Sequence, residues 1–325
     1  MIAAIGALRS DSALTEVPLF NAAGILLVSP GAGYAGFTRA VAPGEPEHWF
    51  PSGRPTFARV VGDDDAQAET LVRVALTAGR RISVEADAGK EPEALTTAIV
   101  RKAGTVFSSR PDAVIYVGTD VRAAAGAAET LAREHPQATL VFPDELTRGG
   151  LAAALPPAVR RRAIFVSSAP RPGSTPELRA FERAFEDQFG RTPDPYAVLT
   201  YRAMRRVLQA ISGAGDRARL RRVVVARYLG LPAAAESFTA FRLRGGQRQY
   251  LPSLSSVAST VISPTAPSAR EMMQISLVSW AVFWNVSSSR PGTLARVTSS
   301  IFEIVGAPSM LRMWTFASVC TESGT

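Results

Sequence analysis

The sequence contains very few of the residues that usually build metal sites and nucleophilic centres. Only one of its 325 residues is a cysteine, Cys320, and only two are histidines, His48 and His135. A single cysteine excludes an intramolecular disulfide framework and a thiolate metal site. Both histidines lie in polar, proline-flanked segments, which favours surface positions over metal ligation. Because this composition also disfavours a Ser-His-Asp arrangement, we expect no enzymatic activity and no cofactor.

Lysine is nearly absent, although the chain is basic. The formal net charge is +8, yet Lys90 and Lys102 are the only lysines among 36 basic residues. The arginines are scattered, and the densest runs, 160–162 and 217–222, contain no aromatic side chains that could stack on bases. We therefore expect no nucleic-acid partner.

No segment of the sequence is long and apolar enough to suggest a membrane span. The longest apolar run, 275–286, is interrupted by Ser276, Ser279 and Asn285, whereas a spanning helix needs about 20 residues. Residues 1–5 lack the basic start and apolar core of a secretory signal, so we expect no signal peptide in this chain.

What the sequence does contain is a regular alternation of short apolar runs and helical patterns. Hydrophobic residues make up 46% of the chain, enough for a sizeable core. The alternation is typical of a mostly parallel sheet. We expect strands at residues 2–5, 25–29, 57–61, 81–85, 113–117, 139–142 and 163–167.

Turn and cap residues mark several helices. Ser12 is expected to cap the first helix, and Asp63 the helix that follows the third strand. Thr175, which precedes a proline, is expected to open a helix that stops at Gly190. Farther on, we expect a helix over 195–211, a helix or strand over 220–228 and a hairpin over 238–251.

A glycine-rich turn invites a dinucleotide-binding interpretation. Gly31, Gly33 and Gly36 form a G-x-G-x-x-G pattern after an expected strand. A dinucleotide site also needs a helix that starts inside the motif and an acidic residue about 20 positions later. Residues 37–46 contain two prolines and cannot form a long helix, so we expect no dinucleotide cofactor. The turn instead offers bare backbone N–H groups, against which a small carboxylate could sit.

Several segments, in order, resemble one known family. They are 3–12, 17–30, 57–67, the run Pro-Asp-Ala-Val-Ile-Tyr-Val-Gly at 111–118, and 185–211. Their order and spacing over residues 1–253 resemble the leucine/branched-chain amino-acid-binding family of type I periplasmic binding proteins.

The resemblance implies an α/β fold of two Rossmann-like, doubly wound lobes, with ligand bound between them and closure by hinge bending. Residues 1–79 and 169–236 would form lobe 1, and 80–168 and 237–253 would form lobe 2. The family begins with a further βαβ segment, so we expect the first lobe to be incomplete. Residues 254–325, where serine becomes abundant, are expected to be a tail outside this fold.

By the same resemblance, three residues of the first lobe would hold a ligand carboxylate. The Ser10 hydroxyl would donate a hydrogen bond, and Gly31 and Gly33 would offer backbone groups. Each has a structural alternative: Ser10 as a helix cap, and the two glycines as residues that serve only the turn.

Three residues of the second lobe complete the implied ligand set. Asp144 falls where the family places an acidic partner for the ligand ammonium, and Thr119 or Asp120 near the family's second-lobe tyrosine. Asp144 has its own alternative as a helix cap. The sequence departs from the family at Gly33, often a threonine there, and at 89–92, which lacks the usual aromatic-glycine pair. It is also too short over 91–112 for the usual helix-strand-helix.

The resemblance further implies a solute-binding component of an ABC importer, with permease subunits as partners and an amino acid or amide as ligand. Its location would be extracytoplasmic, in the periplasm or as a lipoprotein. The alternatives are a ligand-sensing module of the same fold with the tail as its partner-binding segment, a Rossmann-type enzyme, and a truncated product without function.

Overall fold

The structure, a computed structural model of the full chain, describes residues 1–104, 106–212, 214, 220–231 and 238–252, and the backbone of two later strands. It divides into two units, Met1–Ser256 and Val257–Thr325. In the second unit, β10 (Ser299–Glu303) pairs antiparallel with β11 (Arg312–Phe316). The rest of the expected tail lies outside the described residues.

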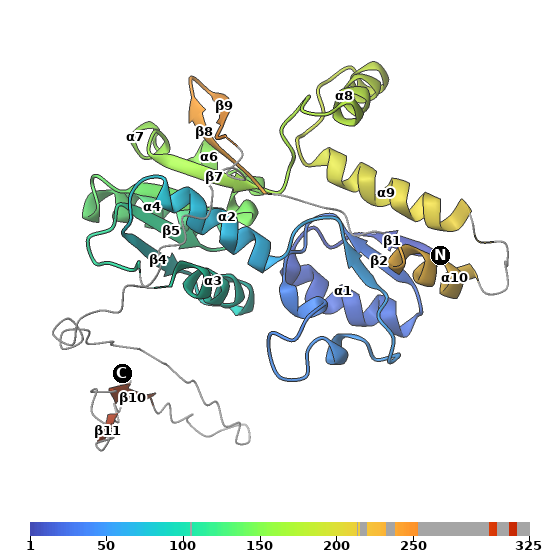
Figure 1. Cartoon of the computed structure of the whole chain (residues 1–325), viewed down its shortest axis with the longest axis horizontal. Coiled ribbons are helices and arrows are strands. Elements are labelled where there is room, and N and C mark those ends of the chain that lie inside the picture. The colour runs from blue at the N-terminus through green and yellow to red at the C-terminus, as the bar shows by residue number, and fades with distance from the viewer. Residues whose placement is uncertain are drawn as a thin grey trace, which may run out of the picture. The chain divides into compact units, whose positions relative to one another are not determined.

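The first unit contains two separate sheets (Figure 1). The smaller one is parallel, in the order β1 (Ala3–Ile5), β2 (Leu26–Ser29) and β3 (Phe57–Arg59). We call this sheet and the helices packed on it the first lobe. The strands are largely apolar, as expected for a parallel sheet covered on both faces, and β2 and β3 end on the polar Ser29 and Arg59.

Helices cover both faces of the small sheet. On one face, α1 (Ser10–Ala22) and two 3₁₀ turns, Ala35–Phe37 and Glu47–Trp49, bury a cluster around Phe37 and Phe57. On the other, α9 (Ala197–Ser212) and α10 (Leu220–Leu229) pack against Leu26 and Val28, joined by Leu178 of α8 (Pro176–Phe189). The first lobe is therefore doubly wound.

The larger sheet has six strands, and we call it and its helices the second lobe. Four strands are parallel and two antiparallel, in the order β4 (Ile82–Ala86), β5 (Ala113–Val117), β6 (Thr139–Phe142), β7 (Ala163–Ser167), β8 (Thr239–Arg244) and β9 (Gln247–Tyr250). The expected hairpin is present as β8 and β9.

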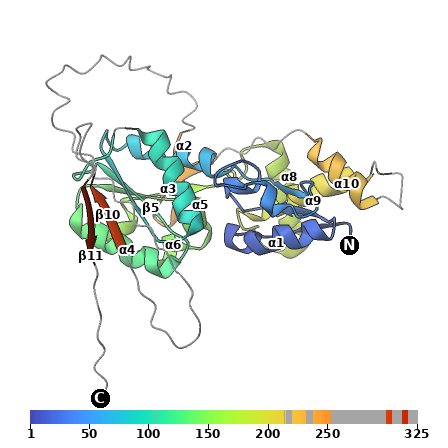
Figure 2. The same cartoon turned by 90° about the horizontal axis from the view of Figure 1, so that it is seen from below.

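This sheet is also covered on both faces, and Figure 2 shows β5 between the two helical layers. One layer is α2 (Asp64–Leu76) and α3 (Lys90–Ala103). The other contains α4 (Val121–Glu134), α5 (Asp144–Arg148), α6 (Leu151–Ala154) and α7 (Pro157–Arg160).

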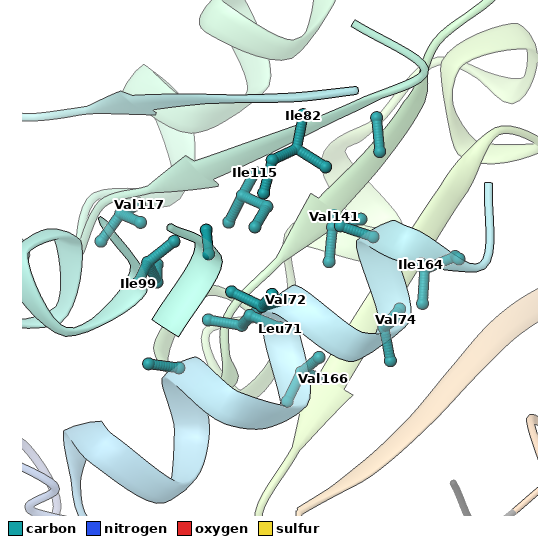
Figure 3. Close-up of a cluster of buried hydrophobic side chains, with 14 of the residues drawn as sticks. Leu71, Val72, Val74, Ile82, Ile99, Ile115, Val117, Val141, Ile164 and Val166 are labelled. Carbon is teal, nitrogen blue, oxygen red and sulfur yellow. The ribbon is translucent and has the colours of Figure 1, made fainter. Parts of the chain in front are cut away.

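The helix α2 packs on the second sheet, whereas the expected boundary at residue 79 placed it in the first lobe. Its apolar face packs on the second sheet, where Leu71 and Val74 meet Ile115 and Val141 (Figure 3). Burial of such side chains stabilises the fold by about 1.5–3 kcal/mol each. The chain therefore crosses between lobes directly after β3, at residues 60–63, and α2 belongs with the second lobe.

Capping residues begin two of the helices where the sequence predicts them. Asp63 caps α2 by accepting from the Asp65 and Ala66 amides, and Thr175 caps α8, which ends at left-handed Gly190 (φ 64°). The prediction that Ser12 caps the first helix is wrong, because α1 already begins at Ser10. The segment left open between helix and strand is the helix α10. Among the described helices, none has the length and apolar character of a membrane span.

Candidate functional site

A crevice lies where loops from both sheets converge. The strand-end loops of β2 and β3 contribute from the first lobe, and those of β5 and β6 from the second. Open α/β sheets bind ligands at these carboxyl ends. The empty space of the crevice, including its open mouth, is about 440 Å³, of which the centre of a water molecule can reach about 20 Å³, room for about one water. Its lining includes Gly31, Gly33, Asp64, Gln67, Glu91, Thr119, Asp144 and Glu145.

The two glycines of the first-lobe loop have different structural roles. A Cβ on Gly31 would lie 1.9 Å from Arg148 Nη1 and 2.4 Å from the Leu8 carbonyl oxygen, so only glycine fits there. A Cβ on Gly33 would meet nothing closer than Asp64 Oδ1 at 3.5 Å. The expectation of a bare amide is wrong for Gly31, whose N–H donates to Ser29 Oγ at 3.1 Å.

Ser10 is buried behind the crevice rather than in its lining. Only 1% of the residue is exposed, and its hydroxyl oxygen accepts a hydrogen bond from the Tyr34 amide at 3.1 Å. The same hydroxyl interacts with the carboxyl group of Glu91. Ser10 therefore joins the first lobe to a carboxylate of the second, and it is not the cap of α1, which has no side-chain cap.

Asp144 lines the crevice but is already well supplied with donors. Its carboxylate accepts from the Ser168 amide, the Ser168 hydroxyl and the Tyr196 hydroxyl, each at 2.8 Å. The Asp144 amide donates to Gln67 Oε1 at 2.7 Å. This network fixes the strand-end loop of β6 and places the neighbouring Glu145 at the crevice.

The two candidate ligand residues after β5, Thr119 and Asp120, have different roles in the structure. Thr119 lines the crevice, whereas Asp120 caps α4 by accepting from the Ala123 amide at 2.7 Å. Cap residues stabilise a helix by about 1 kcal/mol, which accounts for Asp120 without a ligand. Asp120 is not among the lining residues, so its expected contact with a ligand stays a prediction.

Three crevice carboxylates were not among the expected site residues: Asp64, Glu91 and Glu145. Each lies in the first turn of a helix, of α2, α3 and α5 respectively. Acidic residues at such positions usually serve the helix dipole, so the sequence signal for a site is weak. Only the convergence of three helix starts from different parts of the chain distinguishes them.

Burial shifts the protonation of these carboxyl groups. Desolvation raises the pKa of Asp64 to about 7, although the Ala35 amide and Arg59 favour the charged form. Desolvation, and next the charge of Glu145, raise the pKa of Glu91, against the Ser10 hydroxyl. Desolvation likewise raises the pKa of Glu145, despite its ion pair with Arg148. Burial in the crevice therefore favours the protonated form of all three carboxyl groups.

Polar contacts join the two lobes beside the crevice. Arg148 of α5 donates to the Gly31 carbonyl oxygen at 3.2 Å, and Arg9 lies 3.6 Å from Glu145. These contacts use long, flexible side chains at the crevice edge. They are the kind of contact that can break and re-form when two lobes move.

A second contact between the lobes involves Lys90, the first residue of α3. Its ammonium lies 2.9 Å from Glu45 Oε1, and its Nζ is 5.2 Å from the ring centroid of Tyr34 and 4.8 Å from that of Trp49. The Tyr34 hydroxyl donates to Glu45 at 2.6 Å. We call Tyr34, Glu45 and Trp49 the Lys90 cage.

Comparison with solved structures finds solute-binding proteins. The leucine-binding protein LivK of Thermotoga maritima has a TM-score of 0.62 at 16% identity, over 78% of this chain and 79% of that chain. An ABC-transporter solute-binding protein of R. palustris in complex with benzoate has a TM-score of 0.59 at 20% identity, over 77% and 76%. LivJ of Streptococcus pneumoniae in complex with isoleucine has a TM-score of 0.57 at 13% identity, over 77% and 78%.

At these identities the likeness shows the fold and transfers no ligand. The chain has the two-lobed α/β fold of type I periplasmic binding proteins, and its structural neighbours are of the class that the sequence resembles. No family model matches the sequence. No curated protein matches it either.

Proposed function

We propose that this chain is the solute-binding component of an ABC importer and that it holds a small polar ligand in the crevice between its lobes. The observation that carries the proposal is the convergence of strand-end loops from two separate sheets on one crevice. Fold similarity to solute-binding proteins supports it, including proteins solved with isoleucine and with benzoate.

In this proposal the ligand binds by hinge motion. The first lobe comprises the described residues of 1–62 and 176–231, and the second comprises those of 63–168 and 238–251. The short crossings after β3 and β7 act as hinges. Because the crevice admits about one water in this geometry, the lobes part to admit a ligand and close around it.

The proposed contacts follow the placement of the residues. Thr119 and the Gly33 backbone would contact the ligand directly, and Gly31 would keep the loop close to the second lobe. Ser10 and Asp144 would support the crevice wall without direct ligand contact. Ser10 would hold Glu91 by its hydroxyl, and Asp144 would hold the loop after β6 by its hydrogen bonds. We propose an extracytoplasmic location and ABC permease subunits as partners, on the basis of the shared fold.

Calorimetric titration of the full chain tests the proposal. The panel is leucine, isoleucine, benzoate, acetamide and propylamine, and one of these classes is expected to bind at a single site. Gly33→Leu should abolish binding, because its side chain enters the crevice where the backbone tolerates a Cβ. Gly126→Leu is the control, since nothing lies within 4 Å of a Cβ there. Silence across the panel would contradict the proposal.

A further inference from the structure

The charges that line the crevice are all of one sign. Four carboxylates, Asp64, Glu91, Asp144 and Glu145, belong to its lining, and no arginine or lysine is among the lining residues that the structure describes. A zwitterion or an organic anion taken out of water needs cationic or N–H donors for its carboxylate. The lining favours the opposite charge.

Glu91 is the least satisfied of these groups. Its Oε2 atom is buried and has no hydrogen-bond partner within the described part of the chain. Buried polar atoms normally have one, and a buried carboxylate oxygen without a partner is costly. Because Glu91 lines the crevice, the missing partner can come from a ligand that enters there.

The arginines near the crevice already have partners, and one of these partners is Glu145 of the lining, which pairs with both Arg148 and Arg9. Arg148 pairs with Glu145 and donates to the Gly31 carbonyl, and Arg9 pairs with Asp11. Arg59 donates to the carbonyl oxygens of Gly33 and Tyr34 at 2.9 and 3.0 Å. Each guanidinium is held by the first-lobe loops or by its own ion pair. Arg9 also interacts with the charge of Glu91, but no described residue forms a hydrogen bond with the buried Oε2 of Glu91.

We infer that the crevice selects a ligand with a cationic head, an alkyl ammonium or similar amine, which donates to Glu91 and lies between the carboxylates of Asp64 and Glu145. This inference rests on the proposed function and gives its ligand class. The space for about one water matches an ammonium head, and the alkyl part requires the lobes to part. The aliphatic Val61, Leu95 and Val117, which also line the crevice, suit that alkyl part.

The inference predicts a characteristic pH dependence. The groups that face Glu91 are Asp64 on α2, Glu145 on α5, and Asp11 and Arg9 at the start of α1. Desolvation and like charge raise the pKa of Glu91, and burial raises that of Asp64 to about 7. An alkyl amine, with a pKa near 10, stays charged throughout the range from pH 5.5 to 8.5. Binding should therefore tighten as the pH rises, and it should release protons near pH 7.

The test titrates the full chain with propylamine, leucine and benzoate at pH 5.5, 7 and 8.5. Propylamine should bind, and its affinity should rise at least about tenfold from pH 5.5 to 8.5, the scale of one charge-assisted hydrogen bond. Heats measured in buffers of different ionisation enthalpy should show proton release at pH 7. Leucine and benzoate should bind at least about tenfold more weakly than propylamine at pH 8.5.

Two glutamates in the same helical turn give a matched pair of variants. Glu91→Gln should weaken propylamine binding at least about tenfold and flatten its pH dependence. Glu93→Gln should leave both unchanged, because Glu93 is exposed and does not line the crevice. A thermal melt of each variant verifies that it is folded, and Asp64→Asn provides a second variant of the lining.

The outcomes separate the two proposals. Binding of leucine or benzoate without propylamine would overturn the cation inference and leave solute binding intact. Equal effects of Glu91→Gln and Glu93→Gln would overturn the role of Glu91. No binding by any member of the wider panel would overturn both proposals.

Discussion

Two glutamates near the first residue of α3 show how differently the fold treats the same side chain: Glu45 of the first lobe, which contacts Lys90, and Glu91 of α3 itself. Glu45, whose side chain is 0% exposed, lies in the Lys90 cage with Lys90, the Tyr34 hydroxyl and the Ala42 amide as partners. Glu91, the next residue after Lys90, has a buried oxygen without a partner in the described residues. Glu45 therefore has its hydrogen-bond and ionic partners within the protein, whereas in our proposal Glu91 receives its missing partner from a ligand that enters the crevice.

Their protonation reflects this difference. Burial would raise the pKa of Glu45, but hydrogen bonds from Tyr34 and Lys90 outweigh it and lower the pKa. Burial dominates at Glu91 and raises the pKa above its ordinary value of 4.5. The comparison therefore distinguishes a carboxylate that stabilises the contact between the lobes from one that costs stability until a ligand binds.

Removal of the Lys90 ammonium should have the largest effect. Lys90→Met keeps the aliphatic stem but leaves Glu45 buried without its cation. The free energy of unfolding should fall by about 2–3 kcal/mol, at or below the loss for a fully buried pair, because Lys90 is 43% exposed. Urea unfolding at pH 7 measures it.

The only other lysine of the chain provides the control. Lys102, also on α3, pairs with Glu69 at 3.5 Å on the surface. Lys102→Met should change the free energy of unfolding by less than about 0.5 kcal/mol. Equal losses in the two variants would show that the Lys90 cage contributes no more than a surface ion pair.

An added methyl group at Gly31 should have an intermediate effect. Gly31→Ala brings a Cβ onto Arg148 and the Leu8 carbonyl oxygen, so the free energy of unfolding should fall by about 1–3 kcal/mol. Gly33→Ala should cost less than about 1 kcal/mol, since its nearest contact is 3.5 Å. Thermal melts of both variants test the difference, and a Gly33→Ala loss as large as that of Gly31→Ala would contradict the crevice geometry.

Loss of the Glu91 charge should change the free energy of unfolding least, and it should raise this free energy rather than lower it. A raised pKa means that the folded state binds more protons than the unfolded state above the ordinary value of 4.5, so stability falls as the pH rises through this range. Glu91→Gln should therefore raise the free energy of unfolding by about 1 kcal/mol at pH 8 and have little effect at pH 4. Urea unfolding at both pH values tests this, and a loss of stability at pH 8 would show that Glu91 is fully satisfied without a ligand.

Glu45 should behave in the opposite way. Its pKa is lowered, so its contribution to stability is present above the ordinary value of 4.5 and is lost as the pH falls through the lowered pKa. Urea unfolding of the Glu45 and Glu91 variants over a range of pH would therefore measure both contributions to stability with one method.

The positions of the strands along the chain were predicted from the residues, and the two-lobed fold from the resemblance to a known family. Apolar runs such as 113–117 and 139–142 coincide with β5 and β6 because parallel strands buried on both faces are continuously apolar. The side on which α2 packs could not be predicted, because an apolar helix face does not identify the sheet that covers it. The lobe boundary therefore lies at the crossing at 60–63 and not at the expected residue 79.

The site was less predictable than the fold. Gly31, Gly33, Thr119 and Asp144 meet at the crevice because strand-end loops of parallel sheets lie on one edge. Ser10 is behind it and Asp120 caps a helix. Glu91 was missed because its burial depends on the other lobe, and a first-turn glutamate carries no sign of this in the sequence.

The central claim is that the two lobes close on a solute. It is tested most directly by the distance between spin labels on exposed positions, Leu19→Cys on α1 and Val100→Cys on α3, in a chain with Cys320→Ser. We expect a broad distribution of distances in the free protein, and a single narrow one with saturating propylamine or whichever panel member binds. The same distribution with and without a ligand that calorimetry shows to bind would contradict the account.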